Sequence, residues 1–158
     1  MTTDPAARSG PPAVDAARLW AGGAATAVIA ALIAVVGIAL VRGVFGIPIL
    51  APEGDGAWGD ASTGWYAAGA ALAALLATAL VHVLLLTTPQ PLRFFGWVVA
   101  LATLIGVVAP FTSGADLDAK VATAALDLVL GIAIWSLVSS VARSAVRSGP
   151  RRRPGPAV

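Results

Sequence analysis

The chain has 158 residues, of which 58% are hydrophobic and only 11% are charged. Soluble domains carry about 25% charged residues, so this composition excludes an ordinary soluble fold. The net charge of +2 and the lack of a basic, aromatic-rich segment argue against a nucleic-acid partner. The absence of cysteine excludes disulfides and thiolate chemistry, and the single histidine excludes a histidine-rich metal centre within one chain.

The first part of the chain predicts a tail followed by a membrane-spanning helix. Residues 1–17 contain prolines, glycine and scattered charges without an apolar period, which is typical of a disordered tail. Residues 19–41 are apolar, and about 20 such residues at ~1.5 Å per residue cross the hydrocarbon layer. Small residues recur along this helix at Gly22, Gly23, Thr26, Ala30, Ala34 and Gly37. Such stripes let helix backbones approach closely in lipid.

The connection 42–64 is the longest in the chain, and its composition predicts a Pro/Gly-rich acidic loop. Pro48 and Pro52 end any helix, and three acids accompany the glycines of the run GDGAWGD. The apolar residues 44–50 predict a short re-entrant or interfacial segment. The residues that suit the amino end of the next helix are Asp60, Ser62 and Thr63.

Two further spans follow at 65–87 and 94–111. Pro89 and Pro91 form a very short turn between them, so these helices must be antiparallel neighbours. Pro110 lies where it ends or kinks the third span. With the fourth span, at 117–141, the sequence predicts an all-α fold: a four-helix transmembrane bundle over 18–142 and a basic disordered tail over 143–158.

The fourth span carries the clearest polar signal in the chain. Asp116, Lys120, Thr123 and Asp127 follow one another at steps of four, three and four, so they share one helix face. Burying a carboxylate such as Asp127 about ten residues into a membrane helix costs roughly 2.5–3.5 kcal/mol on insertion scales. We therefore expect this face to contact protein or water and not lipid.

Several groups are candidate neighbours of Asp127. His82 lies four turns into the second span, at a depth that requires a relay through Thr78, and a lone histidine there is more often a packing residue than a ligand. Thr123 supplies a hydroxyl on the face of Asp127 itself. Lys120 pairs more naturally with Asp116 at i−4, as an outer polar pair. No catalytic or metal-binding set emerges, and we expect no cofactor.

The positions of the basic residues predict the orientation. The first and third connections hold only Arg42 and Lys120, together with five of the eight acids. The other basic residues lie in the tails and the second connection: Arg8, Arg18, Arg93, Arg143, Arg147, Arg151, Arg152 and Arg153. Both termini are therefore expected in the cytoplasm of a plasma-membrane protein, with the loop 42–64 outside. Trp58, Trp65 and Tyr66 would mark the outer interface.

Three segments resemble a known family: LVRGVFGIPILAPEGDGAWGD, TPQPLRFFGWVVALAT and AKVATAALDLVLGIAI. Over residues 17–142 they resemble an actinobacterial family of small four-span membrane proteins that is known only as a domain of unknown function. The resemblance implies a topology and transfers no functional residue.

Three roles for Asp127 stay open at this point. It fixes helix register through hydrogen bonds, it contacts a second copy or another membrane protein, or it binds a proton or cation. Enzyme function is the least favoured, because no nucleophile–base pair or phosphate loop is present. We expect an integral membrane protein, in contact with the lipid bilayer, that acts by association with itself or with other membrane components. A proton- or cation-coupled carrier using Asp127 is the alternative.

Overall fold

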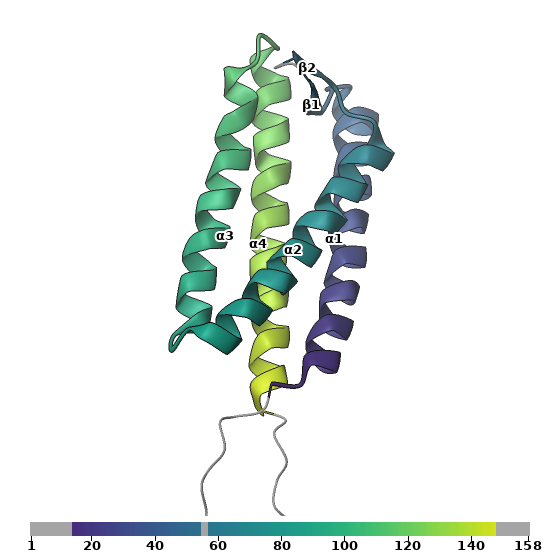
Figure 1. The fold of residues 1–158 in the computed structure, drawn as a ribbon. Coiled ribbons are helices and arrows are strands. Elements are labelled where there is room, and N and C mark those ends of the chain that lie inside the picture. The colour runs from purple at the N-terminus through teal and green to yellow at the C-terminus, as the bar shows by residue number, and fades with distance from the viewer. Residues whose placement is uncertain (1–13, 55–56, 148–158) are drawn as a thin grey trace, which may run out of the picture.

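The computed structural model describes residues 14–54 and 57–147, which form a bundle of long helices with a small sheet at one end (Figure 1). The helices are α1 (Ala16–Phe45), α2 (Thr63–Thr87), α3 (Pro91–Val108) and α4 (Leu117–Arg147). The strands β1 (Leu50–Gly54) and β2 (Ala57–Asp60) lie between α1 and α2. We call the end with the strands the sheet end, and the opposite end, where the described chain begins and finishes, the terminal end.

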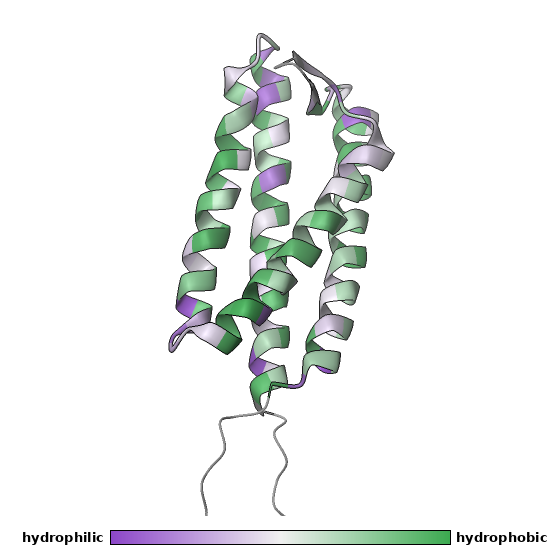
Figure 2. Ribbon diagram, viewed as in Figure 1, coloured by the Kyte–Doolittle hydropathy of each residue, from purple (hydrophilic) through white to green (hydrophobic). Residues whose placement is uncertain are grey.

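Four helices of the described chain are long and apolar enough to cross a membrane, which confirms the all-α four-helix class. Hydrophobic residues cover most of each helix in Figure 2, and hydrophilic ones gather toward the two ends. The third of these segments runs from Pro91 to Thr112, because α3 continues into a 3₁₀ turn at Ala109–Thr112. Pro110 lies in that turn, so it ends the helix as its missing N–H predicts.

The helices are longer at the terminal end than the sequence indicated. Asp15 caps α1 by accepting a hydrogen bond from the backbone N–H of Arg18 (3.0 Å), and its own N–H donates to the carbonyl of Ala145 (3.3 Å). The expected tails 1–17 and 143–158 are therefore wrong where they meet the bundle, since residues 16–17 and 143–147 are helical. The rest of both tails, 1–13 and 148–158, lies outside the described residues.

The connection between α1 and α2 contains a sheet that the sequence did not predict. β1 and β2 pair antiparallel, with Leu50 opposite Asp60 and Pro52 opposite Trp58. The apolar residues 44–50, expected to form one re-entrant or interfacial segment, are divided between the end of α1 at Phe45 and the start of β1 at Leu50. Gly46 then ends α1 at φ 66°, a left-handed backbone that favours glycine, and its N–H donates to the backbone carbonyl of Arg42 (3.1 Å).

The beginning of α2 follows the prediction. Ser62, one of the three expected capping residues, is the N-cap, and its hydroxyl accepts a hydrogen bond from the N–H of Trp65 (3.3 Å). This bond satisfies one of the free donors of the first turn. The chain therefore passes from β2 into α2 through Ala61 and Ser62 alone.

Two side chains attach the sheet to the helices. The Arg42 guanidinium, near the end of α1, forms an ion pair with Asp60 and donates to the carbonyl of Ala61. On the other side, the backbone N–H of Leu50 donates to the Thr123 hydroxyl of α4 (2.9 Å). The sheet is thus held between α1 and α4.

Close contact at small residues holds the helices together. The α1–α2 contact is the most extensive in the bundle, and a row of buried alanines forms it on both sides. Gly23 of α1 lies so near Thr78 that a Cβ added at Gly23 would come under 3.0 Å from the threonine side chain. Gly131 of α4 meets Thr103 of α3 in the same way.

Gly23→Ala is expected to destabilise the bundle by about 1–3 kcal/mol, the usual cost of overpacking. The added methyl group would overlap Thr78, whose β-branched side chain has little freedom to move away. Thermal unfolding in detergent, followed by circular dichroism, measures the change. The matched control on α1 is Gly43→Ala, which meets nothing within 4 Å and should be neutral or stabilising. An equal loss in both variants would contradict the described α1–α2 contact.

Candidate functional site

A cavity of about 850 Å³ lies between α2, α3 and α4, and β1 borders it at the sheet end. Its wall is almost entirely apolar, and many of its residues are small. The small residues are Ala51 of β1, Gly69, Ala70, Ala73 and Ala77 of α2, Ala102 and Gly106 of α3, and Gly131 of α4. The cavity is an open recess in the bundle and not a sealed void.

The path of α2 creates this recess. Figure 1 shows α2 beside α3 at the terminal end, where a short turn joins them, and then crossing the bundle diagonally toward α1. The two helices therefore diverge toward the sheet end, with α4 behind the space between them. Because α2 and α3 present small side chains there, the space stays unfilled. Exposed residues on both flanks, such as Leu76 and Val98, place its opening on the lateral surface of the bundle.

One buried polar contact lies in the wall of this cavity. The Tyr66 hydroxyl of α2 donates a hydrogen bond to Oδ1 of Asp127 on α4. Both residues line the cavity and both are partly buried. The structure records no hydrogen bond to Asp127 Oδ2 among the described residues, and this oxygen lies 3.6 Å from where a Cβ of Gly106 would stand. Glycine at position 106 therefore leaves room in front of the carboxylate.

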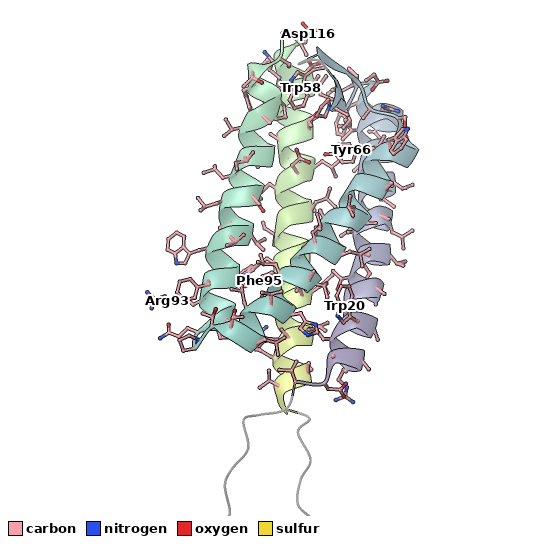
Figure 3. The ribbon with its side chains drawn as sticks, in the orientation of Figure 1. Trp20, Trp58, Tyr66, Arg93, Phe95 and Asp116 are labelled. Atoms are coloured by element: carbon pink, nitrogen blue, oxygen red, sulfur yellow. The ribbon has the colours of Figure 1, made fainter. Side chains whose placement is uncertain are left out.

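The other residues predicted near Asp127 lie elsewhere. His82 is at the terminal end, where its Nδ1 accepts a hydrogen bond from the indole N–H of Trp20 (3.0 Å; Figure 3 labels Trp20). Thr78 faces α1 and donates to the carbonyl of Ala74 (2.9 Å). The structure thus separates His82 and Thr78 from Asp127, because they occupy a different end and a different face of α2.

Thr123 lies on the face of α4 that Asp127 shares, one turn nearer the sheet end. Its hydroxyl donates to the carbonyl of Ala119 (2.8 Å) and accepts from Leu50 of β1. With both bonds made, Thr123 serves as an attachment point of the sheet. It does not contact Asp127 through any recorded bond in the part of the chain that the structure describes.

The outer pair Asp116 and Lys120 lies at the sheet end, where Figure 3 labels Asp116. Asp116 precedes α4, and its carbonyl accepts the backbone N–H of Lys120 (3.2 Å). Within residues 14–54 and 57–147, no ion pair joins their side chains. The contact between them is therefore a backbone bond of the first helical turn.

Tyr66 is the site residue that sequence reasoning placed differently. The sequence predicts Tyr66 at the outer membrane interface and Asp127 about ten residues into its helix, well below that interface. The structure removes this difference, because the sheet occupies the outermost level of the bundle and α2 begins beneath it (Figures 1 and 3). The aromatic signal was present in the sequence, but the sheet that lowers Tyr66 to the level of the acid was not predicted.

The site offers a carboxylate, a phenol and an apolar recess. No group of three metal-binding side chains comes together in the described residues. The arrangement is suited to holding an apolar molecule that also donates a hydrogen bond or carries positive charge.

A family model matches residues 14–144 of this chain, and its description is "Family of unknown function (DUF6069)". The chain belongs to this family. Searches of curated proteins and of solved structures found no match. The DUF6069 region contains all of α1, the sheet, α2 and α3, and most of α4. Tyr66, Asp127 and the whole cavity wall therefore belong to the DUF6069 domain.

Tyr66→Phe is expected to lower the free energy of unfolding by about 1–3 kcal/mol, because it leaves a partly buried carboxylate without its donor. Asp127→Asn should cost less, since the amide oxygen still accepts the phenol bond and no charge is buried. Chemical denaturation in mixed micelles measures both. In a chain already carrying Asp127→Ala, Tyr66→Phe should have little further effect. An undiminished effect in that background would show that Tyr66 acts independently of Asp127.

Proposed function

We propose that this protein is a plasma-membrane binding protein that takes up a lipophilic amine in the cavity between α2, α3 and α4. It acts by association with a membrane component, and the proposal assigns it no catalytic reaction. The observation that carries the proposal is the Tyr66–Asp127 pair in the wall of an apolar recess. The carboxylate is the polar anchor, and the small residues of the wall leave space for the apolar part of the ligand.

The size and lining of the cavity support a single small amphiphile. Sites for small molecules measure about 300–1,000 Å³, are mostly apolar and contain a few polar groups that fix orientation. The cavity, at about 850 Å³, lies within this range and contains Tyr66, Thr103 and Asp127 among apolar neighbours. Its lateral opening gives access from the bilayer.

The chemistry of Asp127 supports a cationic head group. A carboxylate among apolar residues gains most from an opposite charge, and acids within membrane segments are commonly paired in this way. Tyr66 occupies Oδ1, while Oδ2 faces the space beside Gly106. A protonated amine at Oδ2 would complete the hydrogen bonding of the carboxylate.

Other occupants fit these observations less well. A second copy of the chain would have to present a basic group at the depth of Asp127, and Lys120, the one basic residue of the fourth span's outer half, lies two turns away. A proton or cation carrier using Asp127 requires a hydrated path, whereas the cavity wall is apolar. The carrier is therefore the second candidate, favoured only by the direct access of the cavity to Asp127.

The proposal also includes an orientation, with both termini in the cytoplasm of an actinobacterial cell. It rests on the excess of arginine at the terminal end and of acids at the sheet end. Because the sequence lacks cysteine, single cysteines can report the side. In whole cells a membrane-impermeant maleimide should label Gly114→Cys but label Gln90→Cys only after lysis. The reverse pattern would show the opposite orientation, with both termini outside the cytoplasm.

A photoreactive dodecylamine tests the proposed ligand class. We expect it to label peptides of α2 and α3 that line the cavity in the purified full chain. Asp127→Asn should reduce this labelling about tenfold, because a charge-assisted hydrogen bond is lost. Asp116→Asn is the matched control, since it removes the same charge from an exposed position outside the cavity, and it should leave the labelling unchanged.

The same probe without its amine, a photoreactive dodecane, separates specific binding from simple partitioning. Equal labelling by both probes, or no effect of Asp127→Asn, would overturn the amine proposal. Native mass spectrometry of gently extracted protein examines the other occupants. If a second copy or another protein is retained at fixed stoichiometry and cross-links to residues of the cavity, the occupant is a protein partner and the amine proposal is wrong. A proton flux in proteoliposomes that Asp127→Asn abolishes would instead support the carrier.

A further inference from the structure

A second pocket, at the terminal end, brings two arginines from different helices together. It has a volume of about 450 Å³, and its lining includes Arg93 of α3, Arg143 of α4 and Gln90 of the α2–α3 turn. Arg93 belongs to the first turn of α3, and Arg143 lies in the last two turns of α4. Both side chains are exposed, and Figure 3 shows Arg93 at the edge of the bundle. This pocket is separate from the cavity that contains Asp127.

The charges in this pocket are not neutralised within the described chain. Arg93 makes one long hydrogen bond to the Gln90 side chain (3.4 Å), and no ion pair to either arginine is recorded among residues 14–54 and 57–147. Asp15 lies nearby, where its N–H bonds to Ala145, but its carboxylate caps α1. The amino end of α3 also has no side-chain cap, so its partial positive charge adds to the two guanidinium groups.

An apolar groove continues from the pocket along the bundle. This groove, of about 620 Å³, lies between α3 and α4 and shares Leu92 and Arg93 with the arginine pocket. Trp97 and Trp135 line it together with aliphatic residues such as Leu104 and Ile132. Tryptophan favours the level of lipid head groups, where its ring is apolar and its N–H is polar. The two spaces together form a cationic pocket with an apolar extension toward the membrane centre.

We infer that this composite site binds one anionic phospholipid. Arg93 and Arg143 hold the phosphate, in the manner of basic pockets between membrane helices that bind lipid head groups, and one acyl chain lies in the α3–α4 groove. Charge complementarity selects the anionic head, and the groove selects a lipid over a free anion. This inference does not depend on the ligand of the α2–α3–α4 cavity.

Native mass spectrometry of the full chain tests the site with dioleoyl phosphatidylglycerol and, as the zwitterionic comparison, dioleoyl phosphatidylcholine. We expect one phosphatidylglycerol to stay bound and phosphatidylcholine to be lost. Arg93→Gln and Arg143→Gln should each lower retention of phosphatidylglycerol about fivefold, and the double variant roughly 25-fold. Ala100→Phe, which fills the groove at an exposed position, should weaken phosphatidylglycerol binding without changing charge.

The control is Arg151→Gln with Arg152→Gln, which removes two positive charges from the basic C-terminal sequence. A loss as large as that of the Arg93/Arg143 double variant would show general attraction to a basic chain and overturn the site. Displacement of the lipid by excess inorganic phosphate would show a simple anion site and reject the role of the acyl chain. Unchanged thermal unfolding of the arginine variants separates lost binding from lost structure. Asp127→Asn should leave phosphatidylglycerol retention intact.

Discussion

Close approach of helix backbones is the constraint on which this bundle depends. In lipid there is little hydrophobic force between helices, so they associate where small side chains allow tight contact. Gly23 meets Thr78 between α1 and α2, and Gly131 meets Thr103 between α3 and α4. Each of these glycines has a partner that fills the space in front of it. Where α2 and α3 separate, the space beside small residues such as Gly69 has no side chain to fill it, and the cavity is the direct result.

The two ends of the bundle carry different chemistry. The cavity with its acid lies toward the sheet end, where the Arg42–Asp60 pair is satisfied within the protein. The terminal end carries Arg93 and Arg143, for which no ion pair is recorded among residues 14–54 and 57–147. An acid within the membrane is costly unless it is paired, so it favours a cationic ligand. An arginine at the membrane surface is close to lipid phosphates, so it favours an anionic head group. The proposed amine site depends on the first interaction and the proposed phospholipid site on the second.

The helical fold could be derived from the sequence because each span is a long apolar run, and connections rich in proline or glycine separate the spans. Pro110 and Ser62 acted as expected, since their effect depends only on local backbone geometry. The sheet was harder to predict, because Pro52 and the glycines around it argue against strands, although the sequence Asp55-Gly56 between β1 and β2 is typical of a hairpin turn. Without the sheet, the sequence places Tyr66 nearer the membrane surface than Asp127, whereas the two side chains lie at the same level in the structure. Asp127 stands out in the sequence as an acid within an apolar helix, whereas its hydrogen-bond partner Tyr66 does not.

The attachment of α2 at both ends has a mechanical consequence. At the terminal end a short turn binds α2 to α3, and at the sheet end only Ala61 and Ser62 separate α2 from β2. The sheet is in turn fastened to α1 and α4 through Arg42 and Thr123. Helix α2 is therefore held at both ends. The angle between α2 and α3 sets how wide the cavity opens at its lateral side. For this angle to change, the contacts that Arg42 and Thr123 make with the sheet must lengthen or break.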